Sequence, residues 1–322
     1  MNRQEFEQRK TQGWNEFDLR VKGLESRGHP VEPEKIPGLF RRICSDLSLA
    51  QYRMYGSHVC DRLNDLSIRG YRLLHRRSGG FGEGTIQFAA RTFPQAVRRE
   101  WRLFVLASLV FWLPLFLVWW SASQEIAWVQ AILKPEGMAS IDSMYGKEAD
   151  TVEHLRSEHG SNFMMFAHYI GNNVGIDFMM FASGVLWGIG TLFYLVFNGI
   201  YFGAVLGYVE YAGDPEKLWT FVASHSSFEL LGMIVVGMAG MKMGFALLAP
   251  GQFSRGHALA RAGRAGLPLL IGGASMTFLA AIVEGFWSAQ PVAKEIKYAV
   301  GIFFWVMHAG YFIFAGRRFR GA

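Results

Sequence analysis

Long apolar runs fill the last two thirds of the chain, whereas its first hundred residues mix apolar and charged positions at helical spacing. The periodicity of this first part predicts three helices, over about residues 3–28, 36–54 and 57–77. Gly28 and the prolines after it should separate the first two helices, and the glycine-rich segment 78–84 should end the third. The pattern therefore predicts an N-terminal helical domain with its linker over residues 1–84.

Residues 85–102 combine apolar and basic positions directly before the first long apolar run. The basic positions are Arg91, Arg98, Arg99 and Arg102. A basic amphipathic segment in this place is typical of a helix that lies against an anionic leaflet. We interpret it as an amphipathic interfacial elbow, and an ordinary positively charged membrane anchor is the alternative.

Residues 103–322 contain apolar runs that are long enough to cross about 30 Å of hydrocarbon. The clear runs are 103–122, 191–210, 228–249, 267–287 and 299–316. Residues 163–211 are roughly twice as long as one crossing helix needs. Two crossings there, with a tight turn near 184–190, place every arginine-rich loop, including 251–266, on one side. We predict an all-α bundle of about six crossings and keep five as the alternative.

The first crossing of this pair is unusually polar, and its partner carries Asn198 beside a glycine ridge. Their polar membrane residues are Asn172, Asn173, Asp177 and Asn198. Because lipid cannot satisfy polar groups, such a segment can be re-entrant rather than a regular span.

Charge is distributed unevenly along the chain. Residues 1–102 hold 19 of the 32 Lys and Arg residues but 12 of the 26 acids, whereas residues 123–165 hold seven acids and three bases. The positive-inside rule therefore places both termini in the cytoplasm and the 123–165 loop outside. Nucleic acid could also explain a basic domain, but a membrane protein needs fewer assumptions. We therefore predict that the protein is embedded in the lipid bilayer and does not bind nucleic acid.

Glycines recur at intervals of four residues on two of the predicted helices. They are Gly199, Gly203, Gly207, Gly240 and Gly244. Such spacing lets two helix backbones approach closely. The first three should pack either between two subunits, which would give a homo-oligomer and most simply a dimer, or within one subunit. The pattern leaves both arrangements open.

His225, Glu229 and Glu284 are the candidates for a polar intramembrane cluster. His225 and Glu229 are four residues apart on one helix face, and Glu284 ends the next predicted crossing on the same, outer side. Ionisable groups at that depth are costly unless they are paired. The cluster is therefore either a proton or cation site, or a hydrogen-bonded knot that fixes helix packing.

Motifs for catalysis are absent from the sequence. There is no phosphate-binding loop or nucleophile elbow, and the spacing of His225 and Glu229 lacks the second His of H-E-x-x-H. Cys44 and Cys60 lack metal-ligand spacing and are interpreted as reduced, buried thiols. We predict a protein that is not an enzyme and has no catalytic residues, cofactor or metal.

Several segments together resemble the stage II sporulation protein M family of bacterial integral membrane proteins. They are LFRRICSDLSLAQ, LNDLSIRGYRLLHR, FPQAVRREW, NNVGIDFMMFASGVLWGIGTLFYLVFNGIYFGAVLG, HSSFELLGMIVVGMAGMKMGFALLAPG and AAIVEGF. The resemblance extends over nearly the whole chain, least clearly over residues 123–160. The chain departs from the family at Ser226, where the family tends to have Gly after the His.

The resemblance implies an inner-membrane protein without known enzymatic activity. The family's namesake anchors cell-wall hydrolases for peptidoglycan remodelling in spore formers, and relatives elsewhere are encoded beside MoxR-type AAA ATPases. We therefore expect a scaffold that couples a cytoplasmic partner, such as an AAA ATPase, to an envelope process. A transporter or permease subunit with a polar His/Glu site near the outer face is the alternative.

Overall fold

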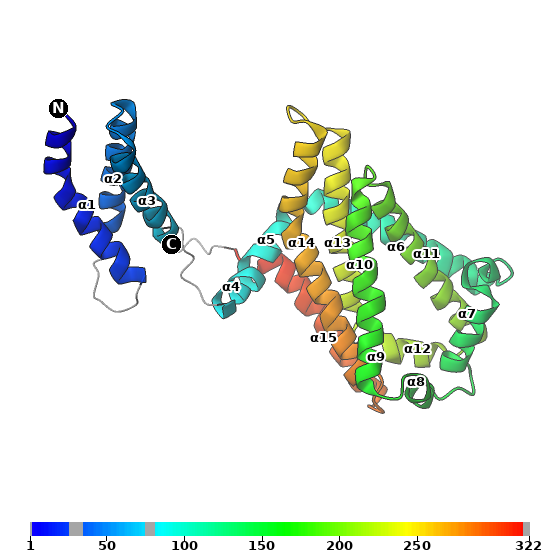
Figure 1. Ribbon diagram of the computed structural model, residues 1–322. Coiled ribbons are helices and arrows are strands. Elements are labelled where there is room, and N and C mark those ends of the chain that lie inside the picture. The colour runs from blue at the N-terminus through cyan, green and yellow to red at the C-terminus, as the bar shows by residue number, and fades with distance from the viewer. Residues whose placement is uncertain (1, 26–34, 75–80, 318–322) are drawn as a thin grey trace, which may run out of the picture. The chain divides into compact units, whose positions relative to one another are not determined.

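A computed structural model describes residues 2–25, 35–74 and 81–317, which belong to two compact units, Met1–Gly82 and Glu83–Ala322 (Figure 1). Every secondary-structure element of the described residues is helical, so the all-α prediction is confirmed. Gly28, residues 78–80 of the predicted linker 78–84 and residues 318–322 lie outside the described residues.

Three helices form the N-terminal unit: α1 (Arg3–Glu25), α2 (Ile36–Tyr52) and α3 (Ser57–Leu74). All three were predicted, and they enclose one core. Its fully or nearly fully buried residues are Phe6, Trp14, Phe17, Val21, Ile36, Ile43, Ala50, Tyr55, Val59, Leu63 and Leu66. The amphipathic faces of the helices therefore meet within this unit, which has a hydrophobic core of its own.

Charged side chains link the outer faces of these helices. Asp18 on α1 accepts a hydrogen bond from Arg69 on α3 at 2.7 Å, and Lys22 Nζ lies 2.8 Å from its other oxygen. Burial alone would raise the pKa of Asp18, but its hydrogen bonds to Lys22 and Arg69 hold that pKa below its usual value.

Five helices of the second unit are long and apolar enough to cross a membrane. They are α6 (Trp101–Gln124), α11 (Ile189–Ala212), α13 (Ser226–Leu248), α14 with its extension η5 (Arg255–Ser288) and α15 (Lys294–Phe314). Residues 251–266 were predicted as a loop, but α14 already begins at Arg255. The prediction failed because this segment is rich in Ala and Arg, which favour helix, and Ser254 caps it by accepting from the His257 amide.

Helix α13 is the centre of this unit. In its most apolar stretch 72% of the residues are buried, against 17% in α6 and in α15. Figure 1 shows α13 running beside α14. Helices that are apolar all round but mostly exposed, such as α6 and α15, are suited to face lipid.

The polar stretch before α11 is one broken helical rod. It consists of α9 (Asn162–Tyr169), the π-helical turn η3 (Ile170–Val174) and α10 (Gly175–Ala182), which packs against α13 and α14. Each piece alone is too short to span a bilayer. A short 3₁₀ turn, η4 (Ser183–Val185), and Gly188, with a φ of 79°, then reverse the chain, as predicted for residues 184–190.

The basic elbow is a helical segment made of α4 (Phe81–Gln87), η2 (Phe88–Thr92) and α5 (Phe93–Arg99). It does not simply lie on the surface. Phe93 is 4% exposed and packs edge-on against Phe312 of α15.

Arg98 differs from the other basic residues of the elbow. Its guanidinium donates to the carbonyls of Phe312 at 2.8 Å and Ala315 at 2.6 Å. The last carbonyls of a helix lack partners of their own, so Arg98 caps the C-terminal end of α15. From the sequence we placed Arg98 against the leaflet, because a capping contact between residues 214 positions apart leaves no local signal. Arg91, Arg99 and Arg102 are exposed, and their contact with lipid stays a prediction.

The predicted outside loop contains two helices, α7 (Val129–Tyr145) and α8 (Thr151–His159), which pack near α12 (Pro215–Val222). Lys217 of α12 fixes the connection between α7 and α8, because its ammonium group donates to the carbonyls of Gly146, Lys147 and Ala149 at 2.7–2.9 Å. This segment is therefore a folded part of the membrane unit.

The glycine ridge of α11 packs within one chain. Gly199, Gly203 and Gly207 face α6, and a Cβ added at Gly203 would lie 2.5 Å from the Leu115 carbonyl oxygen. Gly240 and Gly244 of α13 similarly face the turn between α10 and α11. The ridge is therefore occupied inside the subunit, and a dimer would have to use another face.

We expect Gly203→Ala to destabilise the membrane unit by about 1–3 kcal/mol, because the new methyl group overlaps a backbone carbonyl. Gly310→Ala in α15 is the matched control, since a Cβ there meets no atom within 4 Å. Alanine favours helix over glycine by roughly 0.8–1.0 kcal/mol, so the control should be neutral or stabilising. Denaturant unfolding in detergent measures both, and equal effects would contradict this packing.

Candidate functional site

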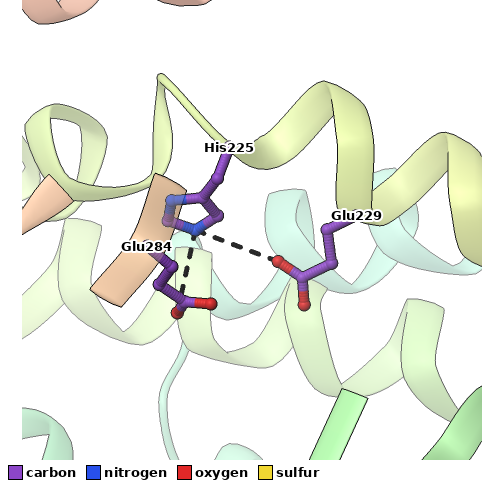
Figure 2. Close-up of side chains that lie close together, drawn as sticks. All are labelled: His225, Glu229 and Glu284. Atoms are coloured by element: carbon purple, nitrogen blue, oxygen red, sulfur yellow. Dashed lines mark ion pairs between the residues drawn. The ribbon is translucent and has the colours of Figure 1, made fainter. Parts of the chain in front are cut away.

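The structure brings His225, Glu229 and Glu284 together. His225 Nε2 lies 3.9 Å from Glu229 Oε2 and 3.8 Å from Glu284 Oε1 (Figure 2). The three residues are 2%, 9% and 6% exposed. Figure 2 shows both carboxylates directed into the space beside the imidazole.

Three backbone features place these side chains. His225 is the residue just before α13, and Glu229 follows in the first turn of that helix. Glu284 begins the π-helical turn η5 (Glu284–Ser288) that extends α14. Helices α13 and α14 lie close together because Gly232 and Gly273 face each other: a Cβ added at Gly232 would lie 2.9 Å from the Gly273 carbonyl oxygen.

Ser288 and Lys297 complete the site and were not predicted. Ser288 Oγ lies 2.9 Å from His225 Nδ1, and Lys297 Nζ donates to the Ser288 carbonyl at 2.7 Å. Since Nδ1 faces Ser288, Nε2 is the nitrogen that faces the two carboxylates. One sequence signal for Ser288 existed, because it follows Glu284 by four residues, the same spacing that joins His225 and Glu229.

The cluster is not a closed network of hydrogen bonds. Distances of 3.8 and 3.9 Å exceed the hydrogen-bond range, so the histidine does not bond directly to either carboxylate. Glu284 Oε2 is buried and has no hydrogen bond of good geometry among the residues that the structure describes, although the Tyr169 side chain lies near the same carboxylate. Buried polar atoms in a structural knot are normally satisfied, so this orphaned oxygen favours a binding site over a knot.

A cavity of about 650 Å³ adjoins the cluster. Its wall comes from α6, α7, α11, α12, α13, α15 and the broken rod, and His225, Glu229 and Glu284 all contribute to it. Much of the wall is aromatic: Trp112, Phe116, Trp119, Phe197, Tyr201, Trp219 and Trp305 are among its residues. A pocket with an aromatic wall and a few converging polar groups is the usual form of a small-ligand site.

The predicted polar membrane residues separate into two groups. Asn172, Asn173 and Asn198 line the cavity. Asn172 donates to Asn173 Oδ1 at 2.8 Å, and Asn198 donates to the Tyr194 carbonyl at 2.8 Å. Asp177 is fully buried outside the cavity wall, and neither of its oxygens has a hydrogen-bond partner in the described part of the chain.

Two π-helical turns border the same cavity. Turn η3 carries Asn172 and Asn173, and turn η5 begins with Glu284. Such turns are rare and occur frequently at functional sites, because the extra residue redirects the side chains of one helical turn. The irregular backbone therefore coincides with the polar groups of the site.

These features define a polytopic helical membrane protein with an ionisable site in its bundle. The chain matches the family model "Stage II sporulation protein M" over residues 107–289, more than half of its length, and it belongs to that family. Residues 4–76 match a separate model, a domain of unknown function (DUF8413). The resemblance is thus confirmed for the membrane part, whereas the N-terminal motifs fall within a different domain. Comparisons with the curated proteins and with the solved structures gave no match.

The effects of Glu229→Gln and Glu284→Gln on unfolding free energy should not add. Two carboxylates whose oxygens lie within 4.8 Å repel each other if both are ionised, and the first substitution removes that repulsion. We expect an interaction energy of roughly 0.5–3 kcal/mol in a double-mutant cycle.

Glu100→Gln provides the control for this cycle. Glu100 forms an ion pair at 2.7 Å with Lys242 of α13. Lys242 is 13 positions after Glu229 on that helix, which corresponds to about 20 Å along the helix axis at 1.5 Å per residue. Its effect should add to that of Glu229→Gln within roughly 0.5 kcal/mol. If the two cluster substitutions were equally additive, the carboxylates would not interact.

Proposed function

We propose that this protein is a transporter or permease subunit of a bacterial inner membrane that takes a small cation into the cavity of its bundle. The observation that carries the proposal is the cavity of about 650 Å³ with His225, Glu229 and Glu284 in its wall. Ionisable residues that face a cavity inside a membrane bundle commonly mark the path of an ion or a proton.

The charge and wall of the cavity favour a cation. Two carboxylates share the site with one imidazole, and the ammonium group of Lys297 donates to the Ser288 carbonyl. The wall also contains aromatic residues such as Trp112 and Trp305, and aromatic rings attract cations over their faces. Among the described residues that line the cavity there is no Lys or Arg to receive an anionic solute.

Six crossings with both termini in the cytoplasm fit this role. The rod from Asn162 to Ala182 would be the sixth crossing, and it packs against α13 and α14. Helices α7, α8 and α12 would then lie outside, and the cavity would open toward the outer half of the membrane. The basic elbow and Arg255, Arg261 and Arg264 would lie inside.

Cysteine labelling tests this topology. In a background where the free, half-buried Cys44 and Cys60 are replaced by Ser, Glu148→Cys and Gln252→Cys introduce two exposed thiols. A membrane-impermeant maleimide should label the first in intact cells and the second only after permeabilisation. Labelling of both from the same side, or the reverse pattern, would contradict the six-crossing arrangement.

Charge movement in proteoliposomes tests the transport role. On a solid-supported membrane, pulses of sodium, choline and manganese ions are applied to the wild type. At least one ion should give a transient current that Glu229→Gln abolishes and Glu100→Gln retains. If no ion gives a current that depends on Glu229, the transport role is wrong.

An anchoring role is the second candidate, and the N-terminal unit favours it. This unit has its own core and matches its own domain model, so it can serve as a docking module. The partner would be cytoplasmic, such as a MoxR-type AAA ATPase, and the anchored process could involve cell-wall hydrolases. Binding of a purified ATPase of that class to the full chain, without any cation current, would favour this role.

A further inference from the structure

We propose that His225, Glu229 and Glu284 bind a divalent transition-metal ion of the class of Mn²⁺, Co²⁺ or Zn²⁺. The inference deepens the proposed function and rests on it, because it names the cation that the cavity takes. No metal was predicted from the sequence, because the spacing of His225 and Glu229 lacks the second His of H-E-x-x-H.

The donor atoms form a suitable set. One imidazole nitrogen and two carboxylate oxygens lie within 4.8 Å of one another. Mixed nitrogen and oxygen ligands suit divalent ions of the first transition row better than Mg²⁺ or Ca²⁺, which prefer oxygen alone. Three protein ligands beside an open cavity leave positions for water or a solute, as in metal sites that exchange ligands.

The spacing of the donors agrees with this class of ion. Metal–ligand bonds of about 2.0–2.2 Å place neighbouring ligand atoms about 3–3.5 Å apart. The separations of 3.8 and 3.9 Å from His225 Nε2 exceed this by a few tenths of an ångström, and the oxygens of Glu229 and Glu284 lie within 4.8 Å of each other. Small rotations of the two glutamate side chains would close that difference, whereas a hydrogen bond does not account for the separations as they are.

The orphaned oxygen is a second, independent observation. Glu284 is 6% exposed, its Oε2 has no hydrogen bond of good geometry among the described residues, and its carboxylate is directed into the cluster (Figure 2). A carboxylate in that position is costly without a compensating charge. A divalent ion between Glu229 and Glu284 would supply this charge and remove the repulsion between the two groups.

The outer contacts of His225 are those of a ligating histidine. Ser288 Oγ forms a hydrogen bond with His225 Nδ1 at 2.9 Å, and Lys297 Nζ donates to the Ser288 carbonyl at 2.7 Å. Metal-bound histidines characteristically use their second nitrogen for such a bond, which fixes the orientation of the ring. Ser288 is therefore a positioning residue in this proposal.

Cobalt binding tests the proposal on the full chain in lipid nanodiscs after treatment with a chelator. We expect saturable binding of one Co²⁺ per chain with visible d–d absorption, and displacement by Zn²⁺. Glu284→Gln should weaken binding by more than tenfold, and Ser288→Ala should weaken it by roughly tenfold without removing a ligand. Glu100→Gln, which loses a carboxylate elsewhere in the same unit, should leave the affinity unchanged.

Each outcome of the titration decides the proposal. Absence of saturable Co²⁺ binding by the wild type, or equal binding by Glu284→Gln, would overturn it. If Glu284→Gln does not fold, the comparison of Ser288→Ala with Glu100→Gln takes its place, and equal affinities would overturn the site.

The titration and the current measurement fail separately. A choline or sodium current that depends on Glu229, without Co²⁺ binding, would overturn the metal site and leave the transport role intact. Co²⁺ binding that depends on Glu284 and Ser288, without any current, would support the metal site and contradict transport.

Discussion

The enclosure of α13 by its neighbours is the constraint on which the membrane unit depends. The helices around it reach its backbone because glycines stand at the contacts: an added Cβ would lie 2.7 Å from Thr277 Oγ1 at Gly232 and 2.9 Å from a Leu195 methyl group at Gly237. Lipid competes poorly with contacts of this closeness, which is why small residues hold membrane helices together. Since packing fixes α13 along its length, it also fixes the end where His225 and Glu229 lie.

Local irregularity then turns this packed bundle into a site. The π-helical turn η5 sets Glu284 and Ser288 on either side of one imidazole ring, with Glu284 Oε1 3.8 Å from Nε2 and Ser288 Oγ 2.9 Å from Nδ1. A second π-helical turn, η3, brings Asn172 and Asn173 to the same cavity. The polar groups thus lie where the regular helix is interrupted, and the regular helices around them supply the rigidity.

The transport and anchoring roles concern different parts of the chain. The cavity lies wholly within the unit Glu83–Ala322, and the candidate docking module is the unit Met1–Gly82. One chain can therefore combine a membrane site with a separate docking module. Asp177, buried with no hydrogen-bond partner in the described residues, is a further ionisable group of the bundle that the cavity does not include.

The sequence by itself determined the three N-terminal helices, the five long apolar spans and the proximity of His225 to Glu229, because these depend on local composition and on the period of a helix. It also indicated Glu284, through depth alone. It could not determine that the Gly203 ridge packs on α6 rather than on a second subunit, since glycine spacing permits close approach without naming a partner. Only the tertiary structure decided that Arg98 caps α15 and that Ser288 and Lys297 complete the site. The contact of Arg98 with α15 and that of His225 with Ser288 join residues 63 or more positions apart, and the contact of Ser288 with Lys297 crosses the turn after η5. No local pattern in the sequence specifies which distant group satisfies a given carbonyl or ring nitrogen.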